Sequence, residues 1–178
     1  MPRYLLPVVA AGLLAAGCTA ETNGTPAPVT TAAVPILNPC DEADLPASAL
    51  KAAGLDPATK NVITDAPTGE TSWRVCSWDP VDELATYRVE LYSTSHTMDE
   101  TRNRTDLSEF TDADIGGREG VTFIEKSDTD RSRCRAAFAA EQGSFILSTA
   151  WLEVDEKPAD LCALAVQYLS DLEPALPK

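Results

Sequence analysis

Hydrophobic residues divide the chain into an apolar start, a polar stretch and a patterned remainder. Residues 4–17 are almost wholly apolar, follow the single cation Arg3 and end in small residues before Cys18. This run is shorter than the roughly 20 residues of a membrane-spanning helix. It is typical of the hydrophobic region of a signal peptide. We therefore expect residues 1–17 to be a signal peptide that is removed on export.

Cys18 is the predicted lipid-attachment residue. Ala15, Ala16 and Gly17 before it are small enough for a narrow protease site to take the chain in extended form. Cys18 would then carry an acyl group such as palmitate, which anchors the mature chain to a membrane. Ala15 stands where a bacterial lipobox more often has a larger aliphatic residue. The alternative is an ordinary secretory signal, which would leave Cys18 as a free thiol.

A tether and one domain are expected after Cys18. Residues 18–37 are rich in Thr, Ala and Pro and have no hydrophobic period, so we expect a flexible tether. Residues 38–178 are too few for two ordinary cores and are expected to fold as one domain.

The hydrophobic pattern of the domain predicts mainly strands. A short helix is expected to start at Asp41 or Asp44 and to end at Gly54. Alternation of apolar and polar residues then predicts strands over residues 73–78, 87–91, 121–124, 134–140 and 144–152, the last two as a hairpin. Residues 94–115 are polar and are expected to be weakly helical at best.

The clearest predicted element is a C-terminal helix. Pro158 suits its first position, and Pro174 ends it. Its apolar residues follow the helical period on one face, namely Leu161, Leu164, Ala165, Tyr168, Leu169 and Leu172. The predicted fold class is α+β, an antiparallel sheet with the N- and C-terminal helices packed on one face.

The charge of the chain excludes some partners. It has 14 Lys and Arg against 28 Asp and Glu, and Arg3 is the only charged residue of the signal, so the mature chain has a formal charge of −15. Nucleic acid needs clusters of basic residues, so we expect no nucleic-acid partner. Docking on anionic lipid headgroups is also disfavoured.

Four further cysteines, Cys40, Cys76, Cys134 and Cys162, predict two disulfides in an exported chain. Four cysteines allow three connectivities. We favour Cys40–Cys76 and Cys134–Cys162, because each pair would join a predicted helix to the predicted sheet. A zinc site is disfavoured, because the cysteines are widely spaced and there is one histidine, His96. No metal or other cofactor is expected.

Three groups of residues resemble parts of functional motifs. Ser93, Ser95 and His96 include a nucleophile and a base, but they are neighbours in sequence and lack the sequence context of a catalytic serine. Residues 128–132 open like a calcium loop, without its later glycine and glutamate. Residues 116–120 are glycine-rich and are expected to form a turn. We predict no catalytic residues.

Other residues have plain structural explanations. The acidic residues Glu153, Asp155 and Glu156 suit the approach to the last helix, where negative charge is favourable. The three tryptophans fit core or sheet packing, and one of them is a candidate for lining a ligand cleft; they are Trp73, Trp78 and Trp151.

Several segments together carry a resemblance to a known family. They are Asn38-Pro39-Cys40, Cys76-Ser77-Trp78, Gly117-Arg118-Glu119, Cys134, Leu161-Cys162 and Leu176-Pro177. The chain resembles the actinobacterial lipoproteins grouped as domain of unknown function 3558, over residues 38–177. By analogy, the fold would be similar to disulfide-linked extracellular sensor domains of mycobacterial kinases. The resemblance implies no activity and no catalytic residue.

The predicted function is a non-catalytic module, anchored to the membrane at Cys18 on its extracytoplasmic side. It would bind an envelope lipid, a small ligand or an envelope protein. Two alternatives stay open: an envelope hydrolase that uses paired carboxylates, and a structural surface protein without a ligand.

Overall fold

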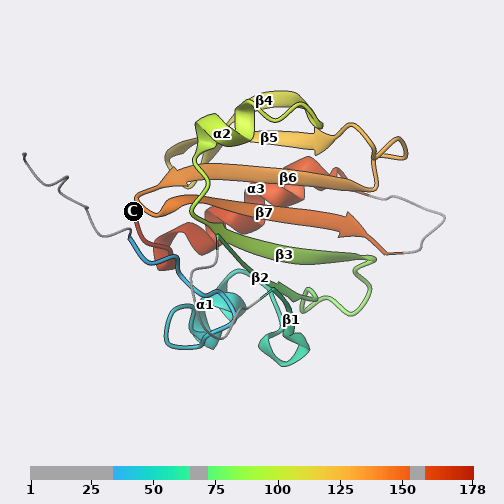
Figure 1. Cartoon of the computed structure of the whole chain (residues 1–178). Coiled ribbons are helices and arrows are strands. Elements are labelled where there is room, and N and C mark those ends of the chain that lie inside the picture. The colour runs from blue at the N-terminus through green and yellow to red at the C-terminus, as the bar shows by residue number, and fades with distance from the viewer. Residues whose placement is uncertain (1–33, 65–71, 153–158) are drawn as a thin grey trace, which may run out of the picture. The chain divides into compact units, whose positions relative to one another are not determined.

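Seven antiparallel strands form one sheet in the computed structural model, which describes residues 34–64, 72–152 and 159–178 (Figure 1). The strands are β1 (Asn61–Thr64), β2 (Trp73–Trp78), β3 (Tyr87–Thr94), β4 (Leu107–Ile115), β5 (Arg118–Glu125), β6 (Arg133–Ala140) and β7 (Gly143–Trp151). Their order across the sheet is β1-β2-β3-β7-β6-β5-β4, so the centre joins strands that are distant in sequence. The described chain is therefore largely β, and the predicted antiparallel sheet is confirmed.

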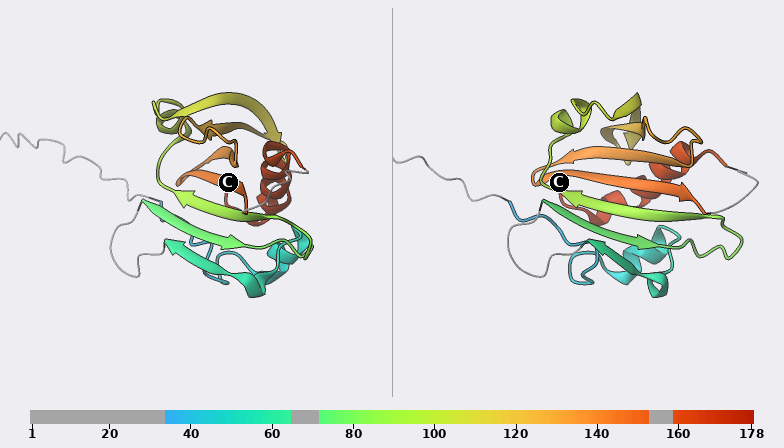
Figure 2. Two further views of the ribbon diagram at one scale, coloured as in Figure 1. Left: turned by 90° about the vertical axis from the view of Figure 1, so that its right-hand side faces the viewer. Right: turned by 45° about the vertical axis from the view of Figure 1, so that its right-hand side comes forward.

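Three α-helices accompany the sheet in these residues: α1 (Ala47–Ala52), α2 (Met98–Arg102) and α3 (Leu161–Leu172). Two single turns of 3-10 helix, η1 (Pro57–Thr59) and η2 (Glu173–Ala175), follow α1 and α3. In Figure 1, α3 lies behind the sheet and α2 lies at its upper rim. Figure 2 shows α3 on one side of the central strands and α2 toward the other. We call the face opposite α3 the open face.

Side chains that alternate along the strands build the main core between the sheet and α3. Strand residues are paired with the apolar side of α3 in one buried cluster, which includes Cys76, Trp78, Val89, Leu91, Phe138, Phe145, Leu147, Ala165, Leu169 and Leu172. Each is less than a tenth exposed. Burial of large apolar side chains at this interface is the main source of stability.

The predicted C-terminal helix is confirmed. It begins at Leu161 after the N-cap Asp160, whose carboxylate accepts hydrogen bonds from the backbone N–H groups of Cys162 and Ala163. Its buried residues are Leu161, Ala165, Tyr168, Leu169 and Leu172, all part of the predicted apolar side. The predicted start at Pro158 lies outside the described residues.

The N-terminal helix is short and has no aspartate cap. α1 follows Pro46, and no side chain makes a capping hydrogen bond. The Asp44 carboxylate instead accepts from the Asn38 N–H at 2.8 Å, and Asp41 accepts from the Ala43 N–H at 3.0 Å. These carboxylates therefore stabilise turns before the helix and do not cap its first turn. Such local side-chain bonds to the backbone compete with helix formation.

The prediction of polar, at best weakly helical structure over residues 94–115 is wrong. Thr97 and Glu100 form a capping box that starts α2. The nine-residue edge strand β4 follows, and only its end residues Leu107 and Ile115 are buried. An edge strand with one solvated face needs few apolar residues, so its hydrophobic pattern is weak.

Two disulfides link the elements, as expected. Cys40 is bonded to Cys76 and Cys134 to Cys162, which are the pairs preferred from the sequence. The first joins the segment before α1 to β2, and the second joins β6 to α3. Their sequence separations are 36 and 28 residues. Loop entropy then gives each bond about 4 kcal/mol of stabilisation.

Candidate functional site

The open face carries side chains in rows that run across the strands. One row is apolar, because residues in register on five strands point to this face: Val75, Tyr92, Ile146, Ala137 and Val121. The next row is mostly polar: Ser77, Glu90, Ser148, Arg135 and Phe123. Since side chains directly opposite in a sheet are close neighbours, the pairing of β3 with β7 makes each row continuous across the sheet.

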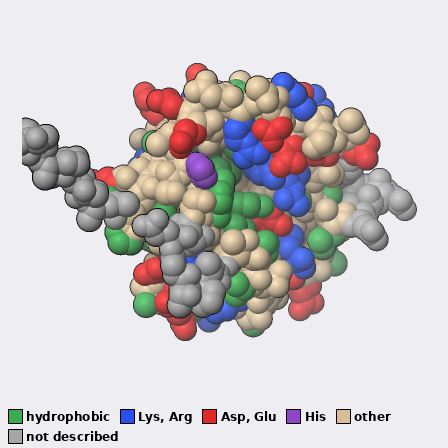
Figure 3. All heavy atoms as spheres, in the orientation of Figure 1, with side chains coloured by type: hydrophobic (Ala, Val, Ile, Leu, Met, Phe, Trp, Pro, Cys, Tyr) green, Lys and Arg blue, Asp and Glu red, His purple; other side chains and the backbone are tan. Residues whose placement is uncertain are grey.

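A pocket of about 340 Å³ opens where these rows meet the rim of the sheet. Its floor is made of Val75, Tyr92, Phe123 and Ile146. Its other lining residues are Thr64, Trp73, Thr101, Arg104, Leu107, Glu125 and Arg135. Figure 3 shows the apolar side chains of this face as a green band bordered by basic side chains. The volume lies at the lower end of the range of small-molecule sites.

Aromatic rings give the pocket its shape. Trp73 packs edge-on against Tyr92, with ring centroids 6.2 Å apart, and Phe110 of β4 packs on Phe123 at 5.3 Å. The second buried cluster of the protein lies here, where Met98 of α2 packs against Leu107, Val121, Phe123, Ala137 and Ile146. α2 and β4 therefore fix one wall, and rigid aromatic side chains form much of the surface.

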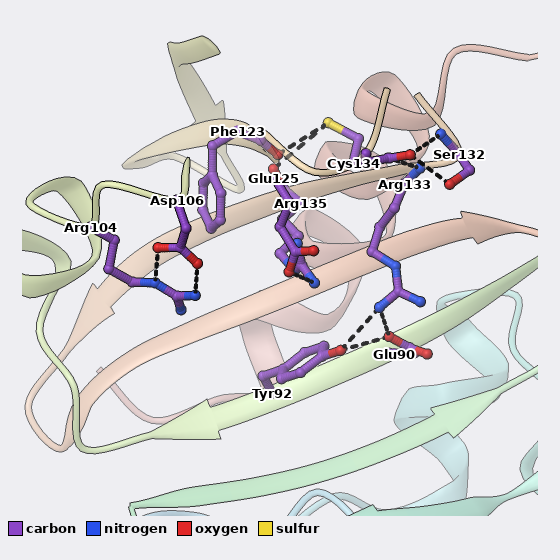
Figure 4. Close-up of polar contacts among 11 residues, drawn as sticks. Glu90, Tyr92, Arg104, Asp106, Phe123, Glu125, Ser132, Arg133, Cys134 and Arg135 are labelled. Carbon is purple, nitrogen blue, oxygen red and sulfur yellow. Dashed lines mark hydrogen bonds and ion pairs between the residues drawn. The ribbon is translucent and has the colours of Figure 1, made fainter. Parts of the chain in front are cut away.

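Two ion pairs border the pocket, and we call their four residues the charge quartet (Figure 4). The Arg104 guanidinium binds both carboxylate oxygens of Asp106, at 3.1 and 2.6 Å. Arg135 binds Glu125 at 2.8 Å, and its side chain is only 12% exposed. The hydrogen bond from Arg104 holds the pKa of Asp106 below its ordinary value. Both carboxylates therefore face arginines directly.

A third polar group extends along the floor from Tyr92. Its hydroxyl donates to Glu90 at 2.7 Å, and Arg133 binds the same carboxylate oxygen at 3.0 Å (Figure 4). Burial raises the pKa of Tyr92 to about 12, and the neighbouring Glu90 carboxylate adds to the shift. The phenol is therefore a neutral hydrogen-bond donor over the whole physiological range.

The structure separates the side chains of Ser93 and His96, for which no catalytic role is expected. The Ser93 hydroxyl accepts from the Gln142 amide at 2.6 Å, on the covered side of the sheet. His96 lies instead beside Glu100, at 3.6 Å, and beside the Trp73 ring, at 5.3 Å between centroids. Ser95 donates its backbone N–H to the Ser72 carbonyl. Within the described chain these residues form no serine–histidine pair.

The two loop motifs have local structural roles. The Asp128 carboxylate accepts hydrogen bonds from the backbone and hydroxyl of Ser132 and from the backbone of Arg133, closing the turn between β5 and β6. Gly116 and Gly117, both at positive φ, form the β4–β5 turn. Among the described residues, no three His, Cys, Asp or Glu side chains gather to hold a metal ion.

The three tryptophans occupy different environments. Trp78 is fully buried in the main core, and Trp151 packs edge-on against Tyr87. Trp73 is the one that lines the pocket. Cys18, the predicted lipid-attachment residue, and the acidic residues 153–156 lie outside the described residues.

Most pocket residues have no distinctive signal in the sequence. Ile146 belongs to a predicted strand, whereas Tyr92 directly follows the predicted strand over residues 87–91, which the structure extends to Thr94. Arg104 follows α2 in the segment expected to be weakly helical at best. Its position beside Arg135 follows from strand order, which the hydrophobic pattern does not specify.

In the described part of the chain, no helix is long and apolar enough to cross a membrane. Comparison with curated proteins and with solved structures gives no match. One family model matches residues 13–175, which is most of the chain, and its description is "Protein of unknown function (DUF3558)". The match includes both disulfides and every strand described above. The chain therefore belongs to this family of proteins of unknown function, DUF3558.

Proposed function

We propose that this chain is a lipid-anchored, extracytoplasmic binding module of the actinobacterial cell envelope, which holds an apolar ligand in the pocket on its open face. The observation that carries the proposal is the pocket itself. Its floor combines aliphatic and aromatic side chains with a few polar groups at the edge, which is the usual composition of a small-molecule site.

The arrangement of the two faces supports a binding role. α3 and two disulfides hold the covered face, so the strands under the pocket are rigid. We include α1 in this supporting layer, because Leu50 of α1 belongs to the same buried cluster as Leu169 of α3. Binding sites on rigid strands keep their geometry better than sites on loops.

The carboxylates near the pocket favour binding over hydrolysis. The general acid of a hydrolase needs a carboxyl pKa raised toward neutrality. The hydrogen bond from Arg104 lowers the pKa of Asp106 instead. Outside the pocket, in the β5–β6 turn, burial acts to raise the pKa of Asp128, but hydrogen bonds from Ser132 outweigh it, so this pKa is also lowered. Both groups are therefore held as carboxylates.

The pocket proposal is tested with an uncharged fluorescent probe, N-phenyl-1-naphthylamine. The full chain with Cys18→Ala is used, so that no attached acyl group competes for the pocket. Thr64 is exposed and lines the pocket, whereas the neighbouring Ile63 is exposed and does not. Thr64→Trp should fill the pocket and weaken probe binding at least tenfold, while the matched control Ile63→Trp leaves it unchanged. The same affinity in both variants, or no probe binding by the parent Cys18→Ala chain, would overturn the proposal.

The anchor is tested separately. Mass spectrometry of the protein from its own membranes should find an N-terminal peptide that begins at acylated Cys18. Cys18→Ala should move the chain from the membrane fraction to the soluble or secreted fraction. An unmodified Cys18 in membrane-bound protein would contradict the anchor and leave the pocket proposal standing. The proposal of a lipid anchor is based on the apolar run of residues 4–17 and the small residues before Cys18.

A further inference from the structure

The charge quartet determines the charge of the ligands that the pocket can bind. It contains two guanidinium groups and two carboxylates, Arg104 with Asp106 and Arg135 with Glu125. Arginines beside an apolar pocket commonly indicate an anionic ligand, because they bind carboxylates and phosphates in a bidentate manner. Here the carboxylate of Asp106 already occupies that position on Arg104, with both of its oxygens.

The four charges act as one group. The hydrogen bond with Asp106 raises the pKa of Arg104, and the more distant Glu125 carboxylate adds to this shift. The Asp106 pKa is lowered first by its hydrogen bond from Arg104 and also by Arg135. Each arginine therefore interacts with both carboxylates, and the formal charge of the quartet is zero.

Tyr92 reports the electrostatic environment of the floor. Arg135 and Arg133 both favour its ionised form, yet burial and the Glu90 carboxylate raise the Tyr92 pKa to about 12. A site built to hold an anion would lower the pKa of a phenol in its floor, because the phenolate would share the favourable field. Burial first, and the Glu90 carboxylate second, therefore disfavour a phenolate at Tyr92 in this floor.

The charge of the whole protein acts in the same direction. The chain has a formal charge of −14, so its long-range field repels anions as they approach. An anion in the pocket would also lie beside Glu125, and like charges in a partly buried site repel strongly. The carboxylates thus block the anion binding that the arginines alone would allow.

We infer that the pocket binds an uncharged apolar small molecule, and that Asp106 and Glu125 exclude anionic analogues by neutralising Arg104 and Arg135. This inference rests on the proposed function of the pocket. Arg135, which is nearly buried, then supplies hydrogen-bond donors to a neutral acceptor such as an ester or ketone oxygen. Aliphatic and aromatic groups of the ligand contact Trp73, Tyr92 and Phe123.

Two probes with one skeleton test the inference. N-phenyl-1-naphthylamine is uncharged, and 1-anilinonaphthalene-8-sulfonate adds a single sulfonate to the same rings. We expect the full chain with Cys18→Ala to bind the uncharged probe at least tenfold more tightly than the sulfonate. Equal or tighter binding of the sulfonate at this pocket would overturn the inference, while the binding function would stand. Absence of binding for both probes would instead overturn the proposed function.

Glu125→Gln sharpens the test, because it removes the carboxylate and keeps the shape. We expect it to tighten sulfonate binding about tenfold relative to binding of the uncharged probe by the same variant. Glu109→Gln is the matched control, since Glu109 pairs with Arg131 at 2.6 Å and does not line the pocket. If both variants raise sulfonate affinity equally, only the overall charge matters and the assigned role of Glu125 is wrong.

Discussion

The two faces of the sheet are built from the same strands but have different roles. On the covered face, alternate residues such as Phe145 and Leu147 are fully buried against α3. On the open face, their neighbour Ile146 forms part of the floor of a pocket bordered by ion pairs. Stability and binding are thus separated here by the two-residue period of a strand. Substitutions on the covered face should therefore change stability and leave ligand binding intact, and substitutions on the open face should do the reverse.

The largest effect is expected on the covered face. Phe145 is fully buried and its ring lies 5.7 Å from that of Phe138. Phe145→Ala should lower the free energy of unfolding by about 3–5 kcal/mol, because it removes buried apolar surface and leaves a cavity. Urea unfolding measures this loss, and probe titration of the folded variant should give the parent affinity. Loss of probe binding in folded protein would show that the faces are coupled.

The disulfide between β6 and α3 is expected to have the next largest effect. Replacing Cys134 and Cys162 together by Ala should lower the unfolding free energy by about 4 kcal/mol, since the unfolded chain gains freedom. Urea unfolding without reductant checks the change. A stability equal to that of the parent chain would mean that α3 is held by packing alone.

Tyr92 provides a prediction for the open face in alkali. Its pKa rises from 10.0 to about 12 in the folded state, so the unfolded state loses the phenol proton first as pH increases. The contribution of Tyr92 to the free energy of unfolding is therefore fully present below pH 10. It is lost between about pH 10 and 12, and the loss is roughly 1 kcal/mol at pH 11. Burial also raises the pKa of Tyr168. Because Tyr168 is present both in the parent chain and in a Tyr92→Phe variant, its contribution cancels when the two are compared.

Tyr92→Phe isolates this contribution. The loss of unfolding free energy between pH 8 and pH 11 should be about 1 kcal/mol smaller in the variant than in the parent chain. Urea titrations at the two pH values measure the difference. An identical loss in the two proteins would contradict the buried, carboxylate-linked environment of the Tyr92 hydroxyl.

The smallest effects compare two neighbours on β7. The Thr149 hydroxyl donates to the Leu161 carbonyl at 2.7 Å on the covered face, so Thr149→Ala should cost about 1 kcal/mol. The Ser148 hydroxyl is buried on the open face without a hydrogen-bond partner among the described residues. Ser148→Ala should therefore change stability by less than about 0.5 kcal/mol. Thermal unfolding of both variants checks the ranking, and the reverse order would contradict the assigned faces.

The covered face was largely predictable from sequence. The helical period of Leu161, Tyr168 and Leu172 marks the side of α3 that is buried. Alternation in β3, β6 and β7 likewise marks the side chains that meet it. The side of each element that meets the main core carries large apolar side chains, so these sequences have a clear hydrophobic period.

The edges of the sheet and the pocket were less predictable. β1 is exposed at every residue, and β4 is buried only at Leu107 and Ile115, so neither has a strong apolar pattern. The pocket depends on β3 pairing with β7, which places Tyr92 beside Ile146. A single sequence shows which side of a strand is apolar, but it does not show which strand lies next to it.

Native mass spectrometry of the protein extracted from its own membranes tests the central claim most directly. The wild-type chain should carry a non-covalent, uncharged apolar molecule, and the Ile63→Trp chain should carry the same molecule. The Thr64→Trp chain should lose it, because the new indole fills the pocket. A ligand that persists in Thr64→Trp, or a bound anionic molecule that disappears with the pocket, would contradict the account.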